Sequence, residues 1–318
     1  MTHCAGSSNP WPSIRVQIDG SSKRQSGASR AEKNSGVFRA VEFTLLTIKE
    51  IAGLCNRGRV KSEVMSSERS IEFDHVNFRL PGGRTLLSDL NLEVNRGETL
   101  VLLGRSGSGK TTTMRLINRL IDPTDGEVRI EGKTTRNWDA IQLRRRIGYV
   151  IQEVGLFPHL NVADNIGVVP RLEGWPAERI KERARELLAM VGLEPSGFAE
   201  RFPKELSGGQ RQRVGVARAL AADPPIILLD EPFGALDPIT RREIQQEFRG
   251  LQEKLHKTMV FVTHDIGEAF ILATRIALLK DGKMILLGPP AELLESPDPE
   301  ARAFAGCFLD NQAVGGRA

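Results

Sequence analysis

Two kinds of apolar pattern follow one another along the chain from Ile71 onward. Some segments alternate apolar and polar residues, which is typical of strands with one buried face: 71–78, 85–94 and 124–132, the last with an Asp-Gly turn. Others are apolar throughout, which is typical of strands buried on both faces: 99–103, 147–151, 226–229 and 259–262. The sequence therefore predicts an antiparallel sheet and, because helical patterns separate the second set, a parallel sheet covered by helices.

A mostly helical insertion is expected between the second and third apolar strands, at about residues 153–220. Its clearest helix has Pro176 in the first turn and ends at Gly192. Apolar residues at helical spacing form one face of this helix: Ile180, Ala184, Leu187, Leu188 and Val191. The expected fold class is α/β, with an antiparallel β-subdomain and an inserted α-helical subdomain.

The loop after the first apolar strand has the composition of a phosphate-binding loop, or P-loop. It reads GRSGSGKT and leads into a helical segment. Its glycines let backbone N–H groups close around a phosphate, Lys110 adds a positive charge between the β- and γ-phosphates, and Thr111 offers a hydroxyl to Mg²⁺. We therefore expect ATP and Mg²⁺ as cofactors, with nucleotide contacts along the loop: Gly104, Arg105, Ser106, Gly107, Ser108, Gly109, Lys110, Thr111 and Thr112.

Polar residues follow the other three apolar strands. Asp230 and Glu231 end one strand. Gln152 directly follows the apolar run 147–151, and His264 comes two residues after the run 259–262. The carboxyl ends of parallel strands meet at one edge of a sheet, so these side chains are expected beside the P-loop. We expect Asp230 to hold Mg²⁺ through water and Glu231 to accept a proton from the attacking water. Gln152 and His264 are expected to reach the γ-phosphate, which makes them catalytic candidates with Glu231.

A second stretch, LSGGQ, also has the character of a phosphate site. Ser207 caps a helix and Gln210 reaches back in a capping box, while Gly208 and Gly209 leave the backbone amides uncovered. With the P-loop and the strand-end residues in this order, the chain resembles the ATP-binding cassette (ABC) family over roughly residues 71–304. The resemblance implies a P-loop NTPase core of the RecA-like type.

The resemblance also implies how the second phosphate site is used. In this family two cassettes pack head to tail, and the LSGGQ motif of one closes over the ATP on the P-loop of the other. A second copy of this chain is therefore expected as a partner. By matching motif, Gln152 is the Q-loop residue and joins Thr111 and Asp230 at the Mg²⁺. Asp237 is the D-loop residue, and His264 is the switch histidine.

Composition and charge limit the classes of function and partner that are expected for this chain. The chain has 318 residues, 40% of them hydrophobic, and a net charge of only +4, so no nucleic-acid partner is expected. We expect a disordered basic extension at residues 1–64, the ATPase domain at 65–310 and a tail at 311–318. The three cysteines have no metal-type or paired spacing, which indicates a reducing cytosol. No apolar run has the length of a membrane span, so any membrane role requires a partner.

A finer resemblance concerns transport. The stretches RRRIGYVIQEVGLFPHLNVADNI and DEPFGALDPITR resemble the ATPase subunit of quaternary-amine importers, which take up glycine betaine, carnitine, choline or related osmoprotectants. The resemblance implies integral membrane permease subunits, an extracytoplasmic substrate-binding protein, and a peripheral location on the cytoplasmic face of the membrane. The alternatives are an importer ATPase for another small solute and a non-transport ABC ATPase. The second is disfavoured because the chain shows neither long heptads nor a second P-loop.

The sequence allows two alternatives at each of two places, the segment 156–160 and the adenine contact. The apolar residues at 156–160 either receive a coupling helix of the membrane subunit or pack the insertion's own core. Many cassettes stack an aromatic ring on adenine at the position of Leu80. Phe78, two residues earlier and on the same strand face, is the alternative.

Overall fold

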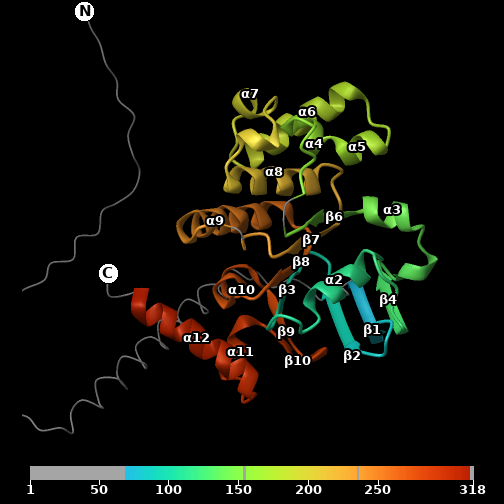
Figure 1. Ribbon diagram of the computed structural model, residues 1–318, viewed down its shortest axis with the longest axis vertical. Coiled ribbons are helices and arrows are strands. Elements are labelled where there is room, and N and C mark those ends of the chain that lie inside the picture. Colours follow the sequence, from blue (N-terminus) through green and yellow to red (C-terminus); the bar gives the residue numbers. More distant parts are fainter. Residues whose placement is uncertain (1–68, 153–154, 235, 316–318) are drawn as a thin grey trace, which may run out of the picture. The chain divides into compact units, whose positions relative to one another are not determined.

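The computed structural model describes residues 69–152, 155–234 and 236–315 (Figure 1). The basic extension expected at residues 1–64 lies outside this part of the chain. Two sheets and the helices around them make up the described residues. Within those residues, no helix is both long enough and apolar enough to cross a bilayer.

The smaller sheet is antiparallel, as the alternating segments predict. Its strands lie in the order β2-β1-β4-β5: β1 (Arg69–Arg79), β2 (Thr85–Asn95), β4 (Asp125–Ile130) and β5 (Lys133–Thr134). The Asp-Gly pair does not form a separate turn, because it supplies the first two residues of β4. Gly126 has φ +79°, and a Cβ there would lie 2.3 Å from the His75 carbonyl oxygen. Glycine thus lets β4 approach a register shift in β1.

The larger sheet contains all four predicted apolar strands. Its order is β10-β9-β3-β8-β7-β6: β3 (Thr99–Leu103), β6 (Ile147–Val150), β7 (Ile226–Asp230), β8 (Thr258–Thr263), β9 (Arg275–Lys280) and β10 (Lys283–Gly288). Every neighbouring pair is parallel except β9 and β10, which are antiparallel. The β9–β10 hairpin was not among the strands that we predicted from apolar runs. Asp281 and Gly282, with φ of 47° and 77°, form its turn, and an Asp-Gly pair between apolar runs is a hairpin signal.

The helices fall into two groups. One group lies in the predicted insertion and gathers at the top of Figure 1: α4 (Val162–Ile166), α5 (Val168–Leu172), α6 (Ala177–Met190), α7 (Pro195–Phe198) and α8 (Gly208–Leu220). The other group lies beside the sheets: α2 (Lys110–Ile117), α3 (Ala140–Arg145), α9 (Pro238–Leu255), α10 (Ile266–Leu272), α11 (Pro290–Glu295) and α12 (Pro299–Gly315). The predicted helix in the insertion is α6. It begins one residue late, because Pro176 is extended and serves as the N-cap.

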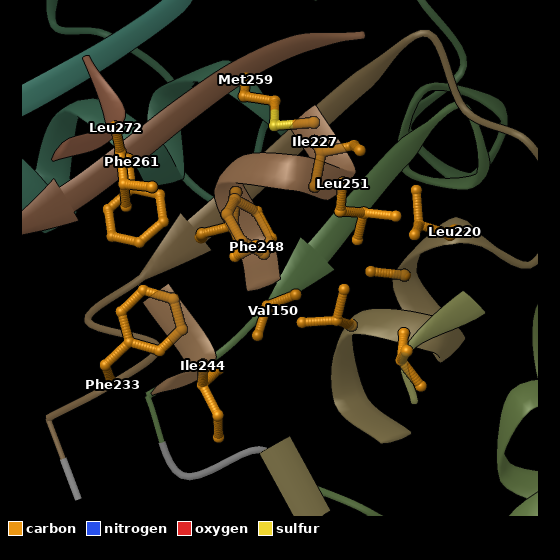
Figure 2. Packing of buried hydrophobic residues seen from close by; sticks show 14 of the residues in the cluster. Val150, Leu220, Ile227, Phe233, Ile244, Phe248, Leu251, Met259, Phe261 and Leu272 are labelled. Atoms are coloured by element: carbon orange, nitrogen blue, oxygen red, sulfur yellow. The ribbon is translucent and has the colours of Figure 1, made fainter. Parts of the chain in front are cut away.

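The parallel strands are buried on both faces, which explains why their sequences do not alternate. Leu100 and Leu102 of β3 belong to a cluster with the antiparallel sheet and α2, whereas Val101 and Leu103 belong to a second cluster with α8 and α9. Figure 2 shows part of the second cluster, where aromatic rings from β8, α9 and the loop after β7 meet. The Phe233 ring lies 5.6 Å from the Phe261 ring. This packing anchors the segment that follows β7.

Candidate functional site

The P-loop is folded around its lysine. The loop joins β3 to α2, and the Lys110 Nζ donates to the carbonyl oxygens of Gly104 at 2.7 Å and Arg105 at 3.0 Å. Glycine is required at both ends of the loop. A Cβ on Gly104 would lie 2.3 Å from the Leu279 carbonyl oxygen, and one on Gly109 would lie 2.6 Å from the Leu87 side chain. The loop therefore approaches its neighbours too closely for any side chain at these two positions.

The charge on Lys110 is held in a desolvated place. Lys110 is 6% exposed. Burial lowers the pKa of its ammonium, while Glu231 and Asp230 oppose that shift. The buried Lys110 ammonium needs negative charge close to it, and a bound phosphate would supply that charge.

Asp230 lies beside the first residues of α2. Its Oδ1 is 3.4 Å from the Thr111 hydroxyl, which donates, and its Oδ2 accepts from the Tyr149 hydroxyl at 3.5 Å. Burial, followed by the Glu231 charge, raises the pKa of the Asp230 carboxyl. Burial and the Asp230 carboxylate also raise the pKa of Tyr149 to about 12, so Tyr149 keeps its proton at neutral pH.

Glu231 has a strained backbone and two side-chain neighbours. Its φ is +43°, an uncommon value for a residue with a side chain, and its N–H donates to the Val262 carbonyl oxygen at 3.0 Å. The Glu231 Oε2 accepts from Gln152 Nε2 at 3.2 Å and lies 3.4 Å from His264 Nδ1. Residues that follow β6, β7 and β8 thus meet at one sheet edge, as the sequence predicts.

Most of these groups line one cavity of about 730 Å³ together with residues of α12, whereas Asp230 and Tyr149 do not line it. Its lining residues are Gly104, Arg105, Ser106, Lys110, Thr111, Gln152, Glu231, His264, Ala303, Phe304 and Cys307. The three residues from α12 were not expected at the site. Their sequence carries no phosphate-binding motif, and only the return of the chain brings them there.

The LSGGQ residues lie elsewhere. Ser207 is the N-cap of α8, where its Oγ accepts from the Gln210 N–H at 3.2 Å and the Gln210 Oε1 accepts from the Ser207 N–H at 2.9 Å. The predicted capping box is therefore present. Gly209 packs on α9, since a Cβ there would lie 3.0 Å from Thr240 Cγ2, whereas Gly208 is exposed. None of Ser207–Gln210 lines the cavity of this chain.

Asp237 also lies away from the cavity lining. It is the N-cap of α9, and its Oδ1 accepts from the N–H groups of Ile239 at 3.2 Å and Thr240 at 3.1 Å. Hydrogen bonding, first from Thr240, lowers the pKa of this exposed carboxyl. Within one chain, the structure therefore brings together the P-loop and the strand-end residues but leaves LSGGQ and Asp237 apart from them.

The two candidates for adenine stacking differ in burial. Leu80 directly follows β1 and is 37% exposed, whereas Phe78 packs partly against the cluster beneath the antiparallel sheet. Neither side chain belongs to the lining of the 730 Å³ cavity. The assignment of an adenine contact stays a prediction.

The oxygen ligands beside the P-loop fit a magnesium ion. Thr111 and Asp230 supply a hydroxyl and a carboxylate 3.4 Å apart, and Gln152 adds an amide near the same edge. In the described residues no cluster of three or more His, Cys, Asp or Glu forms a metal cage. A site with few protein ligands is typical of Mg²⁺ that is shared with nucleotide phosphates.

Fold and site together define a P-loop NTPase. A family model described as "ABC transporter" matches residues 87–234. The chain is 52% identical over 230 residues to the choline transport ATP-binding protein OpuBA of Bacillus subtilis, which covers 72% of this chain and 60% of that protein. It is 49% identical over 247 residues to the glycine betaine uptake system ATP-binding protein YehX of Escherichia coli, covering 78% and 79% of the two chains. The chain belongs to the ABC transporter family.

Solved structures agree with this family. The cassette MJ0796, in a dimeric post-hydrolysis state bound to ADP and Pi, matches with a TM-score of 0.63 and 39% identity over 69% of this chain and 98% of that chain. The cbiO1 protein of Clostridium perfringens, part of an ABC transporter complex, matches with a TM-score of 0.67 and 27% identity over 72% and 92%. The chain spans about three fifths of the length of several curated relatives, at 60%, 63% and 59% for the first three.

Proposed function

We propose that this chain is the ATP-binding and ATP-hydrolysing subunit of an ABC importer for quaternary amines. The observation that carries the proposal is the position of Glu231. Its carboxylate lies between Gln152 and His264 in the cavity that also contains Lys110. A base, a phosphate-binding cation and two polar side chains at one sheet edge are the groups that nucleotide hydrolysis needs.

The proposed chemistry begins with the nucleotide held by the P-loop. Backbone N–H groups and the Lys110 ammonium bind the β- and γ-phosphates and stabilise the charge that builds up on them. Glu231 accepts a proton from the water that attacks the γ-phosphorus, and the bond to the β–γ bridging oxygen breaks. Gln152 and His264 orient the Glu231 carboxylate, as their 3.2 Å and 3.4 Å contacts support, and reach toward the γ-phosphate.

Magnesium belongs to the same proposal. Thr111 and Asp230 would hold the ion, with Gln152 as a further contact. When bound, Mg²⁺ neutralises phosphate charge. The raised pKa of Asp230 supports this role, because a buried carboxylate gains most from a nearby cation.

A second copy of the chain completes the site in this proposal. The LSGGQ helix start, Ser207–Gln210, is capped and exposed at Ser207, yet it does not line the chain's own cavity. Head-to-tail pairing would place it over the partner's P-loop, with Asp237 near the same interface. The MJ0796 cassette, which this chain resembles, is a dimer with ADP and Pi bound, and that likeness supports the arrangement.

The membrane partner is proposed from an exposed apolar surface. Phe157 is 43% exposed and lines a hollow of about 320 Å³ with Val168, Val169 and Tyr149, whereas Leu156 packs against the buried cluster. Within the segment at 156–160, the packing of Leu156 supports the core alternative, and the exposure of Phe157 supports docking of a partner. Integral permease subunits would dock here and hold the chain at the cytoplasmic face of the membrane. An extracytoplasmic binding protein would deliver the solute to them.

The solute class rests on the relatives. Their names specify choline for OpuBA, glycine betaine, carnitine and choline for OpuCA, and an osmoprotectant for OsmV. Receptors for such solutes recognise a permanently charged trimethylammonium group, for which cation–π attraction is suited.

The proposal is tested in proteoliposomes that contain the complex with its own permease and binding protein. Glycine betaine, choline or carnitine should raise ATP hydrolysis and accumulate against its gradient, whereas amino acids, sugars and sulfate should do neither. A saturable response to one of the excluded solutes alone would refute the quaternary-amine assignment. Absence of ATP hydrolysis by the complete complex would refute the enzyme assignment as well.

A further inference from the structure

Helix α12 brings a carboxylate into contact with the P-loop. The Glu300 Oε1 accepts from Arg105 Nε of the P-loop, and its Oε2 lies 3.7 Å from Lys280 Nζ. Glu300 is only 8% exposed, although it lies between two cations that are exposed. A buried carboxylate with two cationic partners is a fixed group rather than a solvated one.

The position of Glu300 is set by the way α12 begins. Asp298 Oδ1 accepts from the N–H groups of Glu300 at 2.7 Å and Ala301 at 3.2 Å, which caps the helix. Farther along, the ring of Phe308 stacks on Phe270 of α10 at 4.3 Å between centroids and 13° between planes. The start of α12 is thus capped by its own Asp298 and its later part is packed on α10, which together fix the position of Glu300.

Arg105 is held at one edge and open at the other. Only its Nε is used by Glu300, and both terminal nitrogens are without a hydrogen-bond partner among the described residues. Its side chain is 70% exposed and lines the cavity with Lys110, Gln152 and His264. A guanidinium in this state presents two N–H donors in a fork, a geometry that matches phosphate oxygens.

We infer that the Arg105 guanidinium binds the terminal phosphate of a nucleoside triphosphate, and that Glu300 is the positioning residue that aims it. The inference rests on the proposed nucleotide site and adds a side-chain contact to a loop whose motif assigns backbone contacts and Lys110. The Glu231 carboxylate lines the same cavity as Arg105 and Lys110, and the Asp230 carboxylate is near enough to act on the Lys110 charge. A second cation offsets their repulsion of the incoming phosphates.

Glu300 contributes by restricting a flexible side chain. An arginine loses considerable rotamer freedom when it binds, and a partner that already holds its Nε reduces that loss. The terminal phosphate is absent from ADP. The side chain of Arg105 should therefore distinguish triphosphate from diphosphate, and Glu300 should act on that distinction only through Arg105.

The test measures the affinity of the full chain for a non-hydrolysable ATP analogue and for ADP, both with Mg²⁺. Arg105→Ala should weaken the analogue about tenfold, the size of a lost charged hydrogen bond, and ADP less than about twofold. Glu300→Gln should weaken the analogue in the same direction, and Glu300→Asp should weaken it less. The double variant Arg105→Ala with Glu300→Gln should be no weaker than Arg105→Ala alone.

A matched control uses the exposed pair Arg249 and Glu253 on α9, whose charges lie 3.7 Å apart and away from the cavity. Arg249→Ala and Glu253→Gln should leave both affinities unchanged. Equal weakening of analogue and ADP by Arg105→Ala, no weakening of either, or tighter analogue binding by Glu300→Gln would each overturn the inference. Failure of the unaltered chain to bind either nucleotide would instead refute the proposed function.

Discussion

The chain contains two helix starts with glycine-rich sequences, and the structure treats them in opposite ways. At α2 the N-cap is Gly109, which has no side chain to cap the helix, and Lys110 beside it is buried. At α8 the N-cap is Ser207, which shares a reciprocal capping box with Gln210 and is exposed. The start of α2 therefore has no side-chain cap for its backbone donors, whereas the start of α8 satisfies part of its own donors and is exposed.

Under the proposed function, the difference separates a phosphate site that one chain builds from one that two chains share. The P-loop contributes a cation and part of the wall of a cavity that the Glu231 carboxylate also lines. LSGGQ has a capped helix start and two glycines, and its residues Ser207–Gln210 do not line that cavity. Mutations in the P-loop should therefore change nucleotide binding by an isolated chain, whereas mutations in LSGGQ should change it only when a partner chain is present.

The largest expected effect is on the complete site. Glu231→Gln keeps the shape of the side chain but removes the proton acceptor, so hydrolysis should fall by at least about a hundredfold while Mg-ATP still binds. Steady-state ATPase assays and equilibrium binding check both parts, and ATP-bound dimers should accumulate in size-exclusion chromatography. Near-normal hydrolysis at saturating ATP would show that another group is the base.

A mixing experiment tests the shared site. Lys110→Ala removes the P-loop cation, and Ser207→Arg places a bulky cation at the LSGGQ helix start, so neither variant alone should dimerise with ATP. In a mixture both lesions fall on one composite site of a heterodimer, which leaves the other site intact. ATP-dependent association of the mixture, measured by light scattering, is the expected result, and its complete absence would contradict head-to-tail pairing.

Glycine substitutions should separate the two helix starts by stability. Gly104→Ala puts a Cβ 2.3 Å from a backbone oxygen at φ +150° and should lower the free energy of unfolding by more than about 2 kcal/mol. Gly208→Ala meets nothing nearer than 3.7 Å and should change it by less than about 1 kcal/mol in the stabilising direction. Urea denaturation of both variants without nucleotide measures the contrast, and equal losses would mean that the P-loop relaxes.

The smallest expected effect is on the pH dependence of stability, to which Asp230 and Asp237 should contribute with opposite signs. The pKa of Asp230 is raised, so this group costs stability as pH rises through its folded pKa, and Asp230→Asn should stabilise the nucleotide-free chain at neutral pH. The pKa of Asp237 is lowered, so its contribution is present above the unfolded pKa and is lost on acidification. Asp237→Asn should therefore destabilise at neutral pH.

Thermal unfolding between pH 3 and pH 7 checks both signs. The two differences from the unaltered chain should become smaller toward the acid end, as the carboxylates take up protons. A stabilising Asp237→Asn, or an Asp230→Asn variant that is destabilised without nucleotide, would remove the electrostatic contrast between the two regions.

The sequence by itself determined those parts of the protein that depend on neighbours in the chain. The P-loop follows from eight consecutive residues, and the capping box follows from Ser207 and Gln210 three positions apart. The buried strands follow from their apolar runs, because a strand covered on both faces has no polar positions. The edge where Gln152, Glu231 and His264 meet was also predictable, since parallel strands bring their carboxyl ends together.

Only the tertiary structure decided which distant residues come together beside the P-loop. Glu300 reaches Arg105 across 195 positions, and nothing in the sequence around either residue indicates the pair. Their contact depends on the β9–β10 hairpin, α11 and the stacking of Phe308 on Phe270, which together return α12 to the P-loop. The local sequence pattern indicates which secondary structure each segment prefers. A contact between distant residues is instead fixed by the packing of every element between them.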